Sequence, residues 1–148
     1  MSRLELPLTY RKLQTTGDVL VRAELNLELN TNQGIWLTLR FLVDSGTEMT
    51  TMPAEEAKFR DLPMPRRPVS GLTFQGREVR CGLLRARVVG MDATEYVFPC
   101  YFLGDPDIPL ANAKNLLGLT GVINQVRLTF DGTPSLVAPC GVLVVEKK

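Results

Sequence analysis

The chain has 148 residues, of which 45% are hydrophobic, and its formal net charge is +1. This length gives room for one domain with a sizeable core and excludes a second lobe of similar size. The balanced charge does not support a nucleic-acid surface or an acidic disordered tail. No run approaches the roughly 18 apolar residues of a membrane span, so we expect a cytoplasmic protein with neither nucleic-acid nor membrane partners.

The sequence contains no histidine, which excludes Ser-His-Asp and Cys-His hydrolases and histidine-ligated zinc enzymes. The three cysteines, Cys81, Cys100 and Cys140, lie far apart and form no Cys-x-x-Cys pair. This spacing argues against a disulfide framework or a zinc site, and we expect small, buried apolar side chains. Hydrolytic chemistry in this chain would therefore have to use carboxylates.

The first part of the chain predicts an N-terminal arm followed by a hairpin. Residues 1–18 mix apolar, proline and basic side chains without a clean period and are assigned to the arm, and residues 19–148 form the domain. Residues 19–29 alternate between apolar and polar side chains, which predicts a half-buried strand. A turn-forming stretch precedes a second apolar strand at residues 35–43, and this hairpin places Asp44 at its end.

The middle of the chain predicts short elements and two further hairpins. Residues 49–52 indicate a short strand, and Pro53 with the acids that follow it predicts a short helix over residues 54–59. The proline-rich segment 62–68 is expected to be a surface connection. Residues 69–79 predict a hairpin with glycines at its bend, and residues 84–103 predict another, turning at Gly90–Ala93.

The C-terminal part predicts a loop over residues 104–114 and a strand over residues 126–130. We interpret Asp131-Gly132 as the hairpin turn after that strand rather than as part of a second catalytic triplet. Residues 141–145 form an apolar terminal strand, which would be an aggregation liability at an open edge. Pairing with a second subunit would cover that edge.

One motif carries chemistry. Phe41-Leu42-Val43-Asp44-Ser45-Gly46-Thr47 places an acid directly after an apolar run and before Ser-Gly. A carboxylate is expensive to bury unless it is hydrogen-bonded or shares a proton, so core positions normally avoid it. The alternative interpretation is a strand that simply ends in an Asp-Ser-Gly turn.

This motif resembles the active-site loop of the retropepsin-like aspartic proteases, the single-lobed relatives of pepsin that include the retroviral enzymes. A second element, Asn115-Leu116-Leu117-Gly118, resembles the family's apolar-apolar-Gly motif, which threads the loop that carries the aspartate. The resemblance covers about residues 19–145 and implies an all-β, single-lobed acid protease barrel of the bacterial type, with one or two short helices. Leu116, Leu117 and Gly118 would then support the catalytic loop.

The resemblance implies an aspartic endopeptidase that hydrolyses peptide bonds in extended peptide or protein substrates. Two carboxylates must lie close enough to share one proton, so that one activates a water while the other polarises the scissile carbonyl. This chain offers one suitable aspartate, and a symmetric homodimer would supply the pair from Asp44 of each subunit. No metal or organic cofactor is expected.

The residues around Asp44 take the roles that the family gives them. Ser45 would brace the partner loop, Gly46 would let the backbone approach the carboxylates, and Thr47 would hydrogen-bond the aspartate and favour an acidic working range. Glu48 corresponds to an acid that in many retroviral relatives pairs with an arginine, but that arginine's position is Leu119 here. This departure leaves the interface charge pair without a counterpart.

The hairpin at residues 69–79 corresponds by position to the flap that closes over substrate in the family, and an ordinary exposed hairpin is the alternative. Gly71, Leu72, Thr73 and Phe74 would cover the peptide, which suggests hydrophobic side chains around the cut bond. Two other functions stay open for the whole chain. One is a catalytically silent peptide-binding or scaffold module, and the other is a structural β-barrel or sandwich in which the motif is coincidental.

Overall fold

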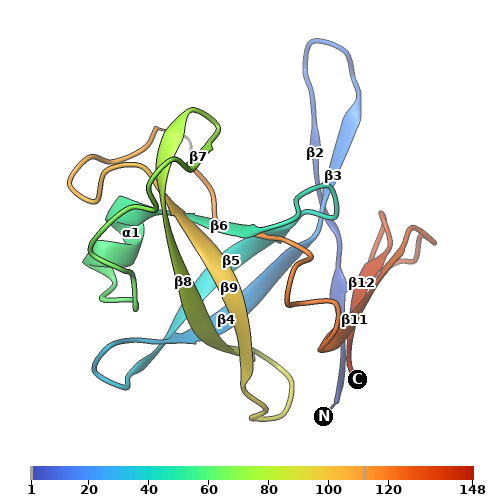
Figure 1. The fold of residues 1–148 in the computed structure, drawn as a ribbon. Helices are drawn as coiled ribbons and strands as arrows, with labels where there is room; N and C mark the ends of the chain where they lie inside the picture. The colour runs from blue at the N-terminus through green and yellow to red at the C-terminus, as the bar shows by residue number, and fades with distance from the viewer. Residues whose placement is uncertain (1, 112) are drawn as a thin grey trace.

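The structure is a computed structural model that describes residues 2–111 and 113–148. These residues form short strands and one helix, in an order that Figure 1 follows by colour. The elements are β1 (Arg3–Pro7), β2 (Thr9–Lys12), β3 (Val19–Arg22), β4 (Glu24–Asn30), β5 (Trp36–Val43), β6 (Thr50–Pro53), α1 (Ala54–Phe59), β7 (Thr73–Phe74), β8 (Arg77–Val88), β9 (Tyr96–Leu103), β10 (Leu116–Leu117), β11 (Val126–Asp131) and β12 (Val142–Lys147). The prediction of an all-β fold is confirmed.

The largest sheet has seven strands in the order β4-β5-β10-β6-β9-β8-β7. A further pairing between β4 and β8 joins its two sides, so six of these strands close into a barrel and β7 hangs from β8. In Figure 1 the barrel occupies the left of the molecule, with α1 on its outer side. Closure removes the free edges that an open sheet would expose to other chains.

The barrel is filled by one face of each strand. Leu25, Leu27 and Leu29 of β4 are all buried, as their alternation with polar residues predicts, and Phe41 and Val43 of β5 are buried beside them. Each strand has a period of two, so a strand with one apolar face turns that face inward. The strand predicted at residues 35–43 is thus confirmed, and its last buried residue directly precedes Asp44.

The single strand predicted over residues 19–29 is wrong, because it is two strands. β3 pairs with β2 in a separate two-stranded ribbon, and β4 begins after Ala23. Val19 and Val21 are exposed by 52% and 51%, although they continue the apolar alternation of β4. Part of the arm predicted at residues 1–18 is therefore ordered as β1 and β2. In Figure 1 the β2–β3 ribbon projects from the top of the molecule.

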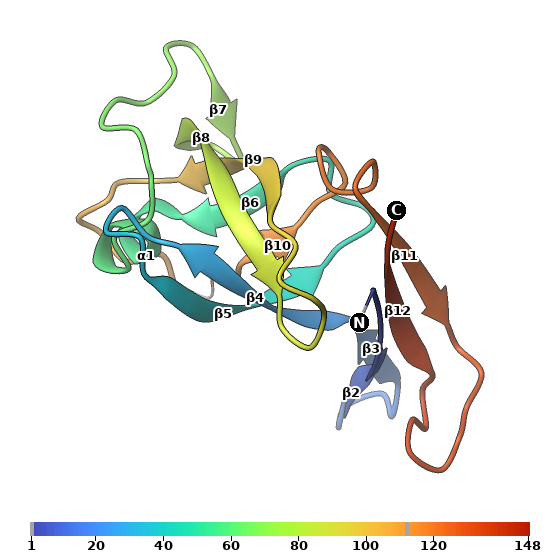
Figure 2. The same ribbon diagram turned by 90° about the horizontal axis from the view of Figure 1, so that it is seen from below.

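The C-terminal strand is not an open edge. β12 is the central strand of a three-stranded sheet in the order β1-β12-β11, and both of its neighbours come from the same chain. Figure 2 shows this sheet beside the barrel, with both chain ends nearby. Pairing with a second subunit is not needed to cover β12, so the sequence-based argument for that pairing fails.

The connections also differ in detail from the prediction. Asp131 ends β11, but β12 begins only at Val142, so Asp131-Gly132 opens a long connection rather than forming a two-residue hairpin turn. β8 runs without a break from Arg77 to Val88, so the two predicted hairpins share one strand. In the part of the chain that the structure describes, no helix is long and apolar enough to cross a membrane.

Candidate active site

Asp44 lies where β5 leaves the barrel. Its backbone N–H donates to the carbonyl of Leu117 over 3.1 Å, and its own carbonyl accepts from the N–H of Thr47, also over 3.1 Å. The first bond prolongs the pairing of β5 with β10, and the second closes a turn at the motif. The side chain of Asp44 is half-buried.

The carboxylate is hydrogen-bonded through both oxygens. Oδ1 accepts from the backbone N–H of Gly46 at 2.9 Å, and Oδ2 accepts from the Thr47 hydroxyl at 2.7 Å. The turn that follows Asp44 therefore fixes the orientation of its carboxylate. A Cβ at position 46 would stand only 3.3 Å from Oδ1, which explains the glycine. Ser45 is exposed at the outside of the turn.

The second motif holds this loop from below. Leu116 and Leu117 of β10 pair in parallel with Leu42 and Val43, and Leu116 also pairs with Thr51 of β6. The motif therefore lies between the strand that precedes the loop and the strand that follows it. A two-residue strand in this position ties both ends of the loop to the barrel.

Gly118 lies in close contact with the backbone of Met49 and Thr50. Its N–H donates to the Thr50 hydroxyl at 3.1 Å, and a Cβ added there would lie 2.4 Å from the carbonyl carbon of Met49. Beyond it, the N–H groups of Leu119 and Thr120 donate to the carbonyls of Thr47 and Glu48. The loop that carries Asp44 is thus bonded along its length to residues 117–120, as the threading implied by the second motif requires.

A cleft of about 720 Å³ opens beside Asp44. Its other lining residues come from the N-terminal segment, from β5 and from the region where β11 ends and β12 begins. They are Leu8, Val21, Arg22, Ala23, Leu42, Val43, Phe130, Gly132 and Cys140. The carboxylate therefore lies at the border of an open, mainly apolar hollow.

Two further hollows continue from this cleft toward β7. One of about 450 Å³ shares Arg22 and Leu42 with the Asp44 cleft. Another, of about 370 Å³, shares Leu110 and Lys114 with the second. The second hollow therefore has lining residues in common with both the first and the third.

The hairpin of β7 and β8 borders the last of these hollows. Its turn is formed by Gln75 and Gly76, which have positive φ angles of 54° and 73°, as a tight two-residue hairpin turn requires. Thr73 and Phe74 form β7, whereas Gly71 and Leu72 lie before the strand. None of these four predicted flap residues lines the Asp44 cleft, so a single chain does not bring them to the carboxylate.

Gln75 and Arg77 line the third hollow, together with Lys114 from the loop before β10. Sequence reasoning did not select these three residues. The Gln75-Gly76 pair was a usable signal, because a glycine in second position is typical of a tight hairpin turn. The side chain of Phe74 packs elsewhere, because its ring lies edge-on against Tyr101 with the ring centroids 5.9 Å apart.

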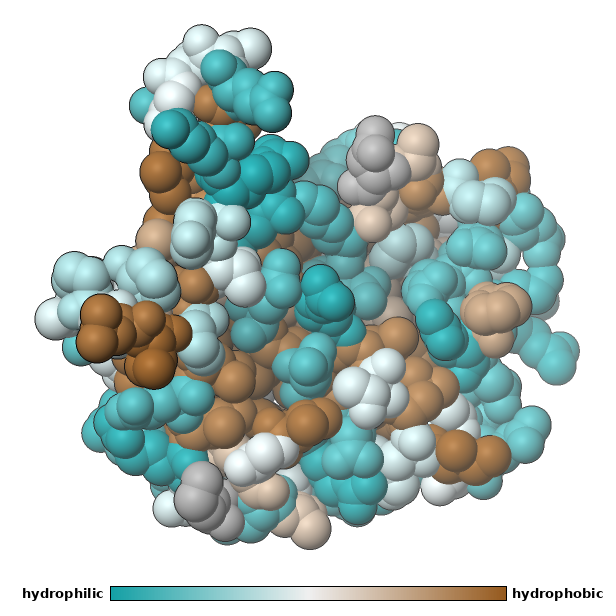
Figure 3. Space-filling view, turned by 180° about the vertical axis from the view of Figure 1, so that it is seen from behind, coloured by the Kyte–Doolittle hydropathy of each residue, from teal (hydrophilic) through white to brown (hydrophobic). Residues whose placement is uncertain are grey.

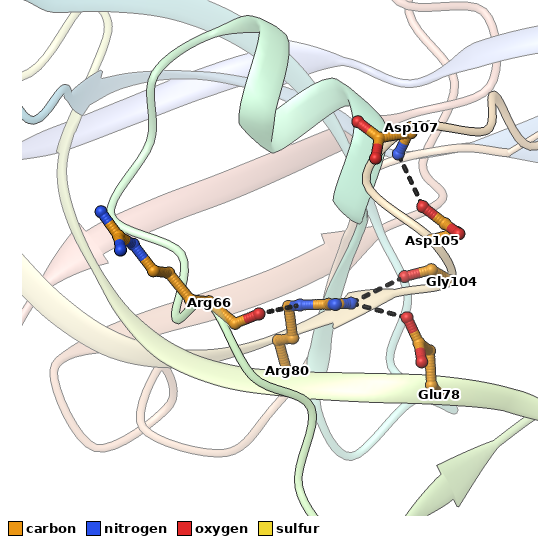
Figure 4. A network of polar contacts seen from close by, with 6 residues as sticks. All are labelled: Arg66, Glu78, Arg80, Gly104, Asp105 and Asp107. Carbon is orange, nitrogen blue, oxygen red and sulfur yellow. Dashed lines mark hydrogen bonds and ion pairs between the residues drawn. The ribbon is translucent and has the colours of Figure 1, made fainter.

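A buried arginine fixes the base of this hairpin, as Figure 4 shows. The guanidinium of Arg80 donates to the Glu78 carboxylate at 2.8 Å and to the carbonyls of Gly104 and Arg66 at 3.1 and 3.3 Å. Arg80 is only 8% exposed, yet it has partners on three segments. It therefore joins the proline-rich connection and the loop after β9 to β8.

The cysteines do not form the uniformly buried set that we expected. Cys100 is buried, Cys140 is half-buried and Cys81 is exposed, and all three are free thiols. Cys81 faces outward because its strand alternates faces, with Arg80 and Gly82 on either side. Burial raises the pKa of Cys100 and, to a smaller degree, that of Cys81. Among the described residues, no three His, Cys, Asp or Glu side chains are grouped to hold a metal ion.

No protein-family model matches this sequence, and neither does any curated protein. Solved structures do match. One of them is described as a retropepsin-like aspartic protease from Rickettsia conorii, with a TM-score of 0.57 and 12% sequence identity, and the match covers 98% of this chain and 92% of that chain. The barrel, the loop with Asp44 and the strand threaded beneath it thus belong to a known architecture: this protein has the retropepsin-like fold.

Proposed function

We propose that this protein is an aspartic endopeptidase that acts as a homodimer, with Asp44 of each subunit in one active site. The observation that carries this proposal is the Asp44 carboxylate. It lies at a cleft, it accepts hydrogen bonds from Gly46 and Thr47, and its loop is threaded by Leu116–Gly118 in a retropepsin-like fold.

The chemistry follows from bringing two such carboxylates together. Two carboxyl groups a few ångströms apart cannot both ionise, so the pair holds one proton between them. The ionised partner takes a proton from a water molecule, which attacks the scissile carbonyl, while the protonated partner donates a hydrogen bond to the carbonyl oxygen. Gly46 and Thr47 donate one hydrogen bond to each carboxylate oxygen of Asp44, and each oxygen has a second lone pair for these contacts.

The substrate would bind as an extended peptide along the three neighbouring hollows. These hollows run from Asp44 past Leu42 and Leu110 to the turn of the β7–β8 hairpin. An extended peptide can pair its backbone with strand edges while alternate side chains enter such hollows. The hairpin would then act as the flap, with Gln75 and Arg77 beside the substrate.

The test compares the wild type with Asp44→Asn on unfolded protein and peptide libraries between about pH 4 and pH 6, an acidic range in which a coupled carboxyl pair can still hold one proton. Asn keeps the size of the side chain but cannot share a proton, so hydrolysis should fall by roughly 10³-fold or more. Asp107→Asn is the matched control. It alters an exposed aspartate in the loop after β9 that lines none of the three hollows, and it should leave the rate unchanged.

Two results would overturn the proposal. If the wild type and Asp44→Asn were equally inert while still dimeric, the chain would be a peptide-binding or scaffold module. If Asp44→Asn retained the hydrolytic rate of the wild type, any activity would come from another group.

A further inference from the structure

The proposed dimer needs a contact surface, and two surfaces suggested by the sequence do not provide it. β12 already pairs on both sides within its own chain. Glu48 is exposed, and Leu119 stands where an arginine could have paired with it. The loop Asp44–Glu48 alone is also too small, because a stable interface takes about 20–30 residues from each partner.

The β2–β3 ribbon has an apolar face that its own chain leaves uncovered. Directly opposed residues of an antiparallel pair point to the same face, so the pairs Tyr10–Val21 and Lys12–Val19 share one side. Tyr10, Val19 and Val21 are each more than half exposed. The opposite side carries Thr9, Arg11, Leu20 and Arg22 and is mostly polar. An isolated two-stranded ribbon is at best marginally stable in water. We therefore expect another surface to pack against the apolar face of this ribbon.

The ribbon borders the Asp44 cleft. Val21 on the apolar face and Arg22 on the polar face both line it, and Phe130 from the end of β11 lines it too. Phe130 is 47% exposed, and Leu136 and Val137 in the β11–β12 connection are exposed by 103% and 84%. Seen from behind, the ribbon projects at the upper left with mostly hydrophilic surface, and hydrophobic atoms gather below it at the same side (Figure 3).

We propose that the apolar face of the β2–β3 ribbon, together with Phe130, is the surface on which a second copy of this chain docks. This inference rests on the proposed function, because one Asp44 makes an incomplete site. In a two-fold dimer the same patch serves both subunits. A patch that borders the Asp44 cleft places the two-fold axis beside the carboxylate, so the contact that buries the ribbon also brings the second Asp44 to the first.

The test measures the dimer dissociation constant by sedimentation equilibrium, in the Asp44→Asn background so that catalysis plays no part. Val19→Lys places a charge on the apolar face and should raise the dissociation constant by about tenfold or more. Leu20→Lys is the matched control. It adds the same charge one residue away, on the polar face, and should change the constant by less than about threefold. Both positions are exposed, so both variants should fold.

The inference is overturned if the protein stays monomeric up to about 0.1 mM, a concentration at which even a weak specific dimer would form. It is also overturned if Val19→Lys and Leu20→Lys weaken the dimer equally. A failure of the proposed function would look different. Wild type and Asp44→Asn would then be equally inert, whatever the effect of Val19→Lys on the dissociation constant.

Discussion

Asp44 receives both of its side-chain hydrogen bonds from residues at most three positions further along the chain. Such a site needs only a strand that ends and a turn that follows, and the turn residues supply the donors. The position of the carboxyl group in space depends on more distant residues. Gly118 is one of these, because a Cβ there would lie only 2.4 Å from the carbonyl carbon of Met49.

Replacing Gly118 by alanine should therefore destabilise the protein. A Cβ 2.4 Å from the Met49 carbonyl carbon would force two backbone segments apart, and neither is a flexible side-chain end that could move away. We expect a loss of about 1–3 kcal/mol in the free energy of unfolding, measured by urea denaturation at one protein concentration.

Gly132→Ala is the control for this measurement. A Cβ at position 132 would meet nothing within 4 Å, so the change should stay within about 0.5 kcal/mol. Equal losses for the two variants would show that the cost comes from alanine itself and not from the crossing at Gly118.

A second aspartate, Asp92, contributes to the dependence of the free energy of unfolding on acidic pH. Hydrogen bonds from the Thr94 hydroxyl and backbone N–H lower the pKa of Asp92 from its ordinary value of 3.8, and Lys147 acts in the same direction. The folded state thus holds its proton less tightly than the unfolded state. The resulting stabilisation is present above pH 3.8 and is lost as the pH falls through the lower, folded-state pKa.

Asp92→Asn should remove this contribution. The variant should be less stable than the wild type at neutral pH. The difference should shrink as the pH falls below 3.8 and through the lower folded-state pKa, where Asp92 becomes protonated in the folded wild type as well. Urea denaturation across the pH range measures the difference. A gap that stays constant down to about pH 2 would contradict the assignment.

At the scale of elements, Arg80 connects three segments that the chain order keeps apart. Its guanidinium bonds to Glu78 on its own strand, to Gly104 after β9 and to Arg66 in the proline-rich connection. The same connection meets the hairpin where the N–H of Val69 donates to the carbonyl of Val79. The base of the β7–β8 hairpin is therefore fixed, while its turn is exposed.

Replacing Arg80 by methionine should cost about 2 kcal/mol or more, since buried hydrogen bonds from a charged donor are lost. Arg85→Met on the same strand is the matched control. Arg85 pairs with Glu95, but its side chain is 52% exposed, so its loss should cost less than about 1 kcal/mol. Hydrogen exchange over residues 69–79 should also become faster in Arg80→Met only. Equal effects of the two variants would show that the buried hydrogen bonds of Arg80 stabilise the protein no more than the exposed ion pair of Arg85.

The limits of prediction from the sequence are visible in two neighbouring strands. Leu25, Leu27 and Leu29 alternate and are buried, whereas Val19 and Val21 alternate in the same way and are exposed. A period of two predicts that a strand has an apolar face, but it does not say what covers that face. The motif at Asp44 could be predicted from the sequence because its side-chain contacts are local. The grouping of Gln75, Arg77 and Lys114 could not be predicted, since the fold brings residues together that are distant in the sequence.

For the molecule as a whole, the proposed site predicts that a dimer of one wild-type and one Asp44→Asn subunit is inactive. Mixing wild type with an equal amount of Asp44→Asn should reduce the activity per wild-type chain to about one half, and a tenfold excess should reduce it to about one tenth. The measurement is a rate at saturating substrate after subunits have exchanged. An activity that does not change with added Asp44→Asn would show that each wild-type chain works alone.

The pairing of β1 with β12 sets the order in which this molecule can be completed. Arg3 lies opposite Glu146, so β1 can find its neighbour only after β12 has been synthesised. During synthesis the barrel can close first, while the three-stranded sheet beside the Asp44 cleft remains unmade. A chain shortened before β12 would therefore lack one wall of the cleft beside the proposed catalytic carboxylate.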